Sequence, residues 1–259
     1  MIRALNTPIS NWVGKRVWII GASSGIGAAL AQSLLQAGAS VAVSARREPE
    51  LATVIQGHTK AAAIVLDVSR AEDWRPALEQ VVNALGGLDL VVMSAARYDP
   101  MHSWDIDLVK VQQSFDLNVV SLYKGLAVVV PHLLAQRSGG IALIGSISGY
   151  TGLPKALVYG ATKASLNNLA ETLYFELAPK GLNVYLVNPG FVKTPMTAVN
   201  DFDMPGLMTP EEAADQIKQG LEKGRFEIRF PKGFANGLRW ISRLPHRWRF
   251  PLLHKATGL

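Results

Sequence analysis

Tyr159 and Lys163 stand four residues apart in the segment Tyr159-Gly-Ala-Thr-Lys163, at the start of a stretch with helical periodicity. Residues i and i+4 share one helix face, so the phenol and the ammonium are expected to lie side by side. A phenol with a pKa of about 10 is a poor acid or base at neutral pH, and a neighbouring ammonium lowers that pKa. Tyr-x-x-x-Lys is also common among exposed helix residues. The pair therefore indicates proton-transfer chemistry only in combination with other motifs, of which the hydroxyl group of Ser146 is one.

A glycine-rich segment, Gly21-Ala-Ser23-Ser24-Gly25-Ile26-Gly27, directly follows the short apolar run Val17–Ile20. Glycines allow a tight turn, a close approach of the backbone to a pyrophosphate, and close packing of a helix on a strand. The following helix would present free N–H groups and a partial positive charge to an anion. A plain tight turn would also use such glycines. The strand before and the helix after the segment favour a nucleotide-binding loop.

The end of the second apolar run bears on which nucleotide is bound. An acidic residue there accepts hydrogen bonds from the adenosine ribose and favours NAD, whereas an arginine favours the extra phosphate of NADP. The chain reads Ala45-Arg46-Arg47, with no acid before Glu48. Arg46 and Arg47 are therefore predicted to select NADP(H). The alternative is that both are solvated surface arginines.

The elements that must position these residues alternate between short apolar runs and longer helical stretches. Such apolar runs are typical of strands that are buried on both faces of a parallel sheet. With right-handed crossovers this pattern predicts an α/β fold: a doubly wound, Rossmann-like parallel sheet flanked by helices. The expected strands are 17–20, 41–44, 61–68, 88–93, 141–144, 182–187 and 226–230, and the expected helices are 28–38, 71–85, 108–136, 158–178 and 211–223. Without a linker or repeat, residues 1–259 are expected to form one domain, with a core of about 15–225 and an arm of about 226–259.

With these motifs in order along residues 15–225, the chain resembles the short-chain dehydrogenase/reductases. The glycines, Ser146, Tyr159 and Lys163 match that family's motifs. Further matches are Asn118 in the long helix before the serine, Asp67-Val68 after the third strand, and the segment from Pro189 to Thr194.

The resemblance implies a shared mechanism. Tyr159 would give or take the proton of the substrate oxygen, and Ser146 would bind that oxygen. Lys163 would hold the nicotinamide ribose and tune the tyrosine, while Asn118 would hold a water in a proton relay. The other residues implied to bind the cofactor are Gly21, Ser23, Ser24, Gly25, Ile26, Gly27, Arg46, Arg47, Asp67, Val68, Ala95, Ala96, Pro189, Gly190, Val192 and Thr194.

One departure concerns the segment after the fourth strand. The family usually has Asn-Asn-Ala-Gly there, and this chain has Met93-Ser94-Ala95-Ala96. This exchange removes two amide groups and adds a methyl group beside the adenosine ribose. We expect the cofactor still to fit.

The segment between Thr194 and Thr209 has no regular period and holds small and apolar residues, and in the family it forms a lid over the substrate. Met196 and Phe202 would form an adaptable apolar wall. Tyr150 and Leu153, between Ser146 and Tyr159, are also expected to face the pocket. The alternative is that these four residues only pack the lid and its neighbours onto the body. An apolar lid favours a hydrophobic carbonyl or alcohol.

The net charge of +6 resides in the tail. Residues 225–259 hold eight Lys or Arg and one acid, Glu227, while residues 1–224 hold 18 Lys or Arg and 19 acids. A neutral body argues against nucleic-acid binding. Leu238, Ile241 and Leu244 share a helix face beside arginines and tryptophans, a pattern that fits peripheral membrane contact. Packing of the arm on the body or on a partner subunit is the alternative, and Pro245 and Pro251 are expected to break the arm into short helices.

These observations favour an NADP(H)-dependent alcohol dehydrogenase or carbonyl reductase over a catalytically silent nucleotide sensor or scaffold, which would not need the full catalytic set. The family resemblance implies a homodimer or homotetramer built through the long helices at 108–136 and 158–178. The chain has no cysteine, and its five histidines are scattered, so no metal site is predicted. No uninterrupted apolar run approaches the length of a membrane span, and the first residues lack the apolar stretch of a secretory signal. A cytoplasmic protein, in contact with the membrane surface at most, is expected.

Overall fold

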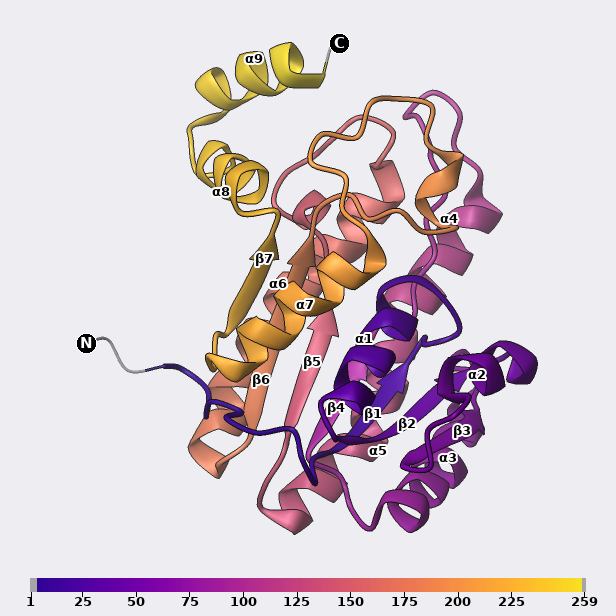
Figure 1. The fold of residues 1–259 in the computed structure, drawn as a ribbon. Helices are drawn as coiled ribbons and strands as arrows, with labels where there is room; N and C mark the ends of the chain where they lie inside the picture. The colour runs from indigo at the N-terminus through magenta and orange to yellow at the C-terminus, as the bar shows by residue number, and fades with distance from the viewer. Residues whose placement is uncertain (1–3, 258–259) are drawn as a thin grey trace.

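Seven parallel strands form one sheet in the order β3-β2-β1-β4-β5-β6-β7, which confirms the predicted fold class (Figure 1). The structure is a computed structural model that describes residues 4–257, so the ends of the predicted domain lie outside the described residues. The strands are β1 (Arg16–Ile20), β2 (Ser40–Ala45), β3 (Ala61–Val65), β4 (Leu90–Met93), β5 (Gly140–Ile144), β6 (Asn183–Pro189) and β7 (Glu227–Phe230).

Helices cover both faces of the sheet and enclose two apolar cores. One layer consists of α1 (Gly25–Gln36), α2 (Glu48–Ile55) and α7 (Pro210–Glu222). The other consists of α3 (Ala71–Leu85), α5 (Ser121–Gln136) and α6 (Leu157–Leu177). The central strands β4 and β5 are buried at every position, which explains why they read as continuous apolar runs.

The predicted long helix at 108–136 is continuous but not uniform. It consists of α4 (Leu108–Phe115), one π-helical turn (Asp116–Val120) and α5. By length and composition alone this helix could cross a membrane. However, α5 packs beside α3 in the core under the sheet, and the core helix of a water-soluble protein passes the same test.

The structure differs from the prediction most clearly at three places. The helix α2 was not predicted, because its eight residues carry a proline in the first turn and only Leu51 and Val54 are buried. The third strand ends at Val65 and not at residue 68, since the chain turns away from the sheet there. In the arm, Pro245 separates α8 (Lys232–Ile241) from α9 (His246–Thr257), as expected, but Pro251 lies inside α9 and does not break it.

The first described residues form a strap that ties the two halves of the chain together. The Asn6 side chain donates to the carbonyl of Val184 at 2.8 Å and accepts from the N–H of the same residue at 3.0 Å. Its backbone N–H donates to the carbonyl of Gly224 at 3.1 Å, and the Trp12 indole donates to Glu222 at 2.9 Å. The strap thereby fastens β6 and the end of α7 to the start of β1.

Candidate active site

A cavity of about 340 Å³ opens at the carboxyl edge of the sheet, where β1 lies between β2 and β4. In open α/β sheets, the point at which the strand order reverses is where ligands bind. The turns after β1 and β4 touch closely there. A Cβ atom on Gly21, whose φ is +85°, would lie 2.5 Å from the backbone nitrogen of Ala95, so only glycine fits.

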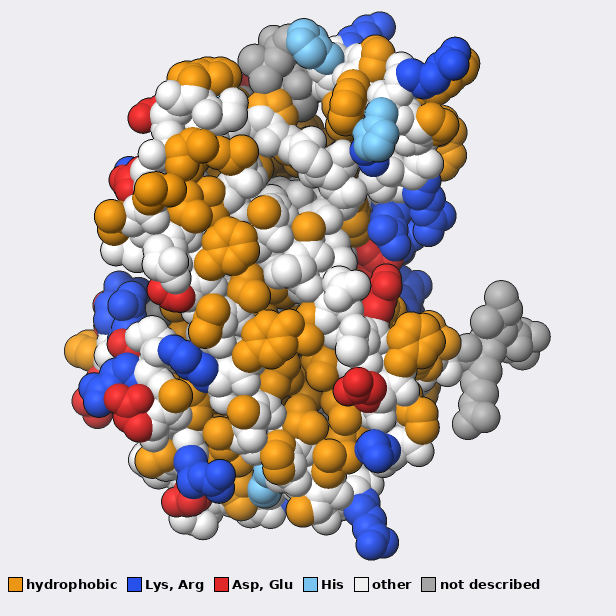
Figure 2. All heavy atoms as spheres, turned by 180° about the vertical axis from the view of Figure 1, so that it is seen from behind, with side chains coloured by type: hydrophobic (Ala, Val, Ile, Leu, Met, Phe, Trp, Pro, Cys, Tyr) orange, Lys and Arg blue, Asp and Glu red, His pale blue; other side chains and the backbone are white. Residues whose placement is uncertain are grey.

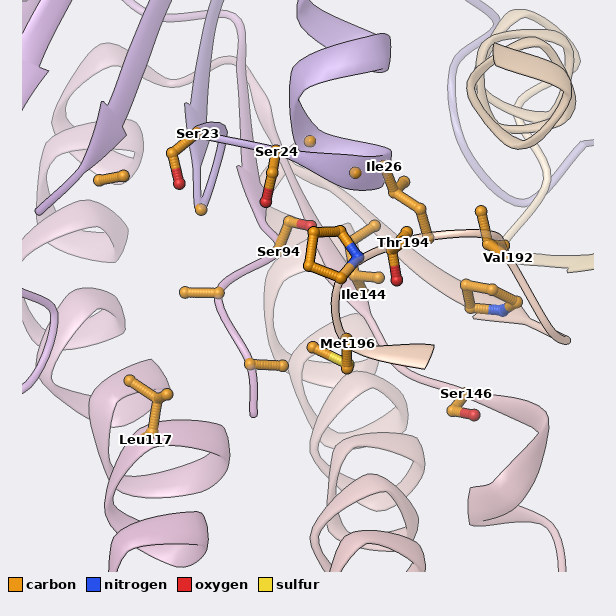
Figure 3. Close-up of a pocket in the computed structure, with 18 of the residues that line it drawn as sticks. Ser23, Ser24, Ile26, Ser94, Leu117, Ile144, Ser146, Val192, Thr194 and Met196 are labelled. Carbon is orange, nitrogen blue, oxygen red and sulfur yellow. The ribbon is translucent and has the colours of Figure 1, made fainter. Parts of the chain in front are cut away.

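The glycine loop fits the pyrophosphate of a dinucleotide. At the start of α1 the Ser24 side chain makes no capping hydrogen bond, and the first turn holds no acidic residue. The N–H groups and positive end of the helix therefore remain available to an anion. Ser23, Ser24 and Ile26 line the cavity beside Ser94, on the segment after β4 (Figure 3).

The two arginines after β2 lie at one end of this cavity and are both exposed. Arg47 pairs with Glu50 at 2.9 Å and donates to the Ser23 hydroxyl at 3.2 Å. Within residues 4–257, no hydrogen bond of the Arg46 side chain is found, although its charge helps to lower the pKa of Asp67. Desolvation opposes that lowering, and hydrogen bonds from Ser69 are its main cause. Val68 lines the cavity, whereas Asp67 does not.

Ser146, Tyr159 and Lys163 come together at the other end of the cavity, as predicted. Ser146 follows β5, and Tyr159 and Lys163 lie in the first turns of α6. The Lys163 ammonium donates to the carbonyl of Ile144 at 2.8 Å and lies 5.6 Å from the centre of the Tyr159 ring. Lys163 is only 2% exposed, and this hydrogen bond together with the packing of α6 on β6 fixes its position.

The electrostatics of this group differ from the expectation that Lys163 would lower the pKa of the tyrosine. Burial raises the pKa of the Tyr159 phenol to about 12, and a hydrogen bond with Ser146 acts in the opposite direction. Burial also lowers the pKa of the Lys163 ammonium to about 8. Both shifts have one physical cause, since a low-dielectric site disfavours the charged form of either group. A phenol with so high a pKa stays protonated across the neutral pH range and can act as a proton donor.

Asn118 lies in the π-helical turn and is buried, but it does not line the cavity. Its side chain accepts from the backbone N–H of Arg97 at 2.8 Å and donates to the carbonyl of Arg97 at 2.9 Å. It also donates to the Thr162 hydroxyl at 3.1 Å. These bonds hold the segment after β4 so that the next residue, Tyr98, lies against Tyr159 with ring centres 5.0 Å apart.

Of the four residues predicted for the substrate pocket, only Met196 lines the cavity. Phe202 lies on the lid with its ring 5.8 Å from that of Phe191. Tyr150 and Leu153 pack instead against the apolar cluster that holds α8 on the body. The structure thus places these two beside the arm, because the loop that carries them leaves the cavity after Ser146.

Glu227, at the start of β7, was not predicted and binds Tyr150. The Tyr150 hydroxyl donates to one carboxylate oxygen, which also accepts from the Asn188 amide at 3.1 Å. Arg229 pairs with the other oxygen at 2.8 Å, and the Arg239 guanidinium lies 4.9 Å from the centre of the Tyr150 ring. Despite its burial, these partners hold the pKa of Glu227 below its usual range. The network fastens the loop after Ser146 to β6, β7 and α8.

Comparison with known proteins identifies the family. The model of the short chain dehydrogenases matches residues 15–204. The chain belongs to the short-chain dehydrogenase/reductase family. An uncharacterized oxidoreductase of Myxococcus xanthus is 32% identical over 233 residues, which cover 88% of this chain and 92% of the relative. The 11-beta-hydroxysteroid dehydrogenase A of Sesamum indicum is 30% identical, over 94% of this chain and 76% of its own.

Three solved structures have the same fold. A short-chain dehydrogenase from Streptomyces avermitilis superposes with a TM-score of 0.80 at 26% identity, covering 94% of this chain and 97% of its own. The 3-ketoacyl-(acyl-carrier-protein) reductase of Brucella melitensis, complexed with NADH, gives 0.80 at 22% identity, over 87% and 100% of the two chains. ElxO with NADP bound superposes with a TM-score of 0.74 at 22% identity, covering 83% of this chain and 97% of its own. The Brucella melitensis neighbour thus holds NADH, and ElxO holds NADP.

Proposed function

We propose that this oxidoreductase uses NADP(H) to interconvert a hydrophobic ketone or aldehyde and its alcohol. The observation that carries the proposal is the group of Ser146, Tyr159 and Lys163, which lines the same cavity as the glycine loop and lies at the end opposite Arg46 and Arg47. A silent nucleotide sensor of the same fold would not need this group, so its presence favours the enzyme.

The residues divide the work of the reaction. A bound nicotinamide nucleotide would supply or accept the hydride. Tyr159 would give its proton to the substrate oxygen during reduction, and Ser146 would hold that oxygen by a hydrogen bond. Lys163 would hold the ribose of the nucleotide, and Asn118 would keep a water in the proton relay. Val192 and Thr194, which line the cavity, would orient the nicotinamide ring.

The preference for NADP(H) rests on Arg46 and Arg47. Both guanidinium groups border the cavity at the end of β2, and no carboxylate precedes Glu48 there. Arg47 is partly neutralised by Glu50. Arg46 is therefore the better partner for a 2′-phosphate.

An apolar substrate is supported by the lid and by one relative. Met196 lines the cavity, and Phe202 and Phe191 form an aromatic pair on the lid. The relative from Sesamum indicum is named for a hydroxysteroid, which is an apolar alcohol.

We further propose one functional domain, cytoplasmic and assembled as a homodimer or homotetramer. Large apolar side chains are exposed along α4, α5 and α6 on the face that Figure 2 shows, where hydrophobic atoms gather. They include Leu108, Val109, Tyr123, Leu157 and Phe175. A contiguous apolar surface of this kind marks an interaction site.

The test is NADPH consumption across ketones and aldehydes of increasing chain length, with NADH in parallel. Tyr159→Phe is expected to abolish turnover while NADPH still binds, and Arg46→Ala to weaken NADPH far more than NADH. Undiminished turnover in Tyr159→Phe would refute the mechanism. Wild-type preference for NADH would refute the role of Arg46.

A further inference from the structure

The helices α8 and α9 leave large aromatic side chains in solvent. Trp240, Trp248 and Phe250 are 62%, 60% and 59% exposed, and Leu252 is 42% exposed. On the opposite side, Leu238 and Leu253 are buried against Ile147 of the body. The arm is therefore anchored by one apolar side and presents a second one outward.

The outer surface of the arm is also cationic. Lys232, Arg243, Arg247 and Lys255 are exposed, and no acidic residue occurs in the sequence after Glu227. Figure 2 shows basic and hydrophobic side chains side by side over this part of the molecule. The Arg247 guanidinium lies 5.8 Å from the centre of the Trp248 ring, so cationic and aromatic groups are in direct contact.

The spacing in α9 places the two kinds of side chain on one face. Trp248, Pro251, Leu252 and Lys255 follow the i, i+3, i+4, i+7 pattern of a single helix face. Tryptophan and apolar residues flanked by Lys and Arg are suited to the interface between lipid headgroups and acyl chains. Uncompensated positive charge selects anionic lipids in particular.

We propose that the α8–α9 arm binds the surface of an anionic lipid bilayer through Trp240, Trp248 and Leu252 and the basic residues around them. The charge and the aromatic side chains of the arm favour a lipid bilayer over two other partners. An acidic protein partner would not require exposed aromatic side chains beside the cations. A second copy of the arm would carry the same positive charge and would repel the first.

The arm lies next to the lid of the active site. The Phe234 ring of α8 stacks on that of Phe191 with centres 6.1 Å apart, and Phe191 contacts Phe202 of the lid. Figure 1 shows the arm and the lid at the same edge of the sheet. Bilayer binding would therefore bring the lid close to the lipid, and the membrane would be the source of the apolar substrate. This last statement rests on the proposed function, whereas bilayer binding does not.

The experiment is co-sedimentation of the full chain with vesicles of phosphatidylcholine alone and with vesicles that also contain phosphatidylglycerol. The wild type is expected to bind the anionic vesicles, less so at high salt. Arg243→Gln with Arg247→Gln lowers the partition coefficient about fivefold per residue. Trp240→Gln with Trp248→Gln lowers it at least about tenfold.

Trp104→Gln is the matched control, because Trp104 is 80% exposed but lies outside the arm. It is expected to bind as the wild type does. The proposal is overturned if the wild type stays in the supernatant, or if both arm variants bind as well as it does. It is also overturned if the arm variants change the oligomeric state and not the vesicle binding, since a second copy would then be the occupant.

Turnover of a water-soluble ketone without lipid separates the two proposals. The arm variants should keep it, along with the wild-type melting temperature, which shows that they are folded. Vesicle binding by a wild type without any NADPH turnover would overturn the proposed function alone.

Discussion

Replacing Lys163 by methionine tests whether burial sets the charge of the catalytic lysine. The ammonium is 2% exposed, and its pKa falls from 10.5 to about 8. The unfolded chain therefore binds this proton more tightly than the folded protein does. As the pH rises through 8, the folded protein releases a proton that the unfolded chain keeps until about 10.5, so the free energy of unfolding rises in this window. From pH 7 to pH 10 the rise amounts to about 2 to 3 kcal/mol.

In Lys163→Met this rise is absent. Near pH 7 the variant loses the hydrogen bond to Ile144, worth about 1 kcal/mol, but it also escapes the cost of burying a charge. At neutral pH the variant should therefore be as stable as the wild type or more stable. At high pH it should be less stable than the wild type. Urea unfolding followed by circular dichroism from about pH 7 to pH 10 measures the difference.

Two features keep this measurement clear. Tyr185, whose pKa is raised by burial, is common to both proteins, so its effect cancels in the difference. Lys60→Met removes an exposed lysine and should follow the wild type. Parallel stability profiles for the wild type and Lys163→Met would refute the reasoning and show that Lys163 keeps its charge at no cost.

Four further predictions concern the residues that shape the site. Gly21→Ala should destabilise the protein by about 1 to 3 kcal/mol more than Gly57→Ala in thermal or urea unfolding. Both glycines have positive φ, but only Gly21 faces a neighbouring backbone. Equal losses of stability would argue against a clash between the new Cβ and that backbone. Tyr150→Phe and Glu227→Gln should each lower the free energy of unfolding by about 1 to 3 kcal/mol, and the double variant should lower it by less than the sum. Additive losses would mean that the hydrogen bond between Tyr150 and Glu227 contributes little to stability. Because the pKa of Glu227 is lowered, its stabilisation is present above a pH of about 4.5 and is lost as the pH falls through the folded value, a loss that Glu227→Gln should not show. Asn118→Ala should lower kcat at least about tenfold in the NADPH assay and leave NADPH affinity nearly unchanged, because Asn118 lies outside the cavity; a large loss of affinity would contradict this.

The sequence was informative wherever function demands a residue type at a fixed place on the chain. Gly21 and Gly27 are needed because a side chain at either position would collide with backbone atoms. Ser146 could be placed because it directly follows an apolar run, and the parallel fold brings the ends of such runs to one edge. For the same reason, nearly all of the residues predicted to bind the cofactor line one cavity, with Asp67 as the exception.

The sequence was uninformative wherever a role depends on contacts across the fold. Glu227 and Tyr150 are 77 residues apart, and nothing in the spacing of either indicates the other. Tyr98 has no motif of its own and acquires its position from the bonds between Asn118 and the neighbouring backbone. The pKa of Tyr159 was predicted with the wrong sign, because helix spacing reveals the nearby lysine but not the burial of both groups.

The strap formed by the first residues has a consequence for the order of events during synthesis. Asn6 is made before its partners Val184 and Gly224, which follow far later in the chain. Until then the central strand β1 can pair with β2 and β4, while the strap before it stays without its native neighbours. Closure of the strap therefore waits until the segment from Val184 to Gly224 has been made. A chain released before α7 is complete would lack the contacts that fasten its beginning, and would be a ready substrate for chaperones and proteases.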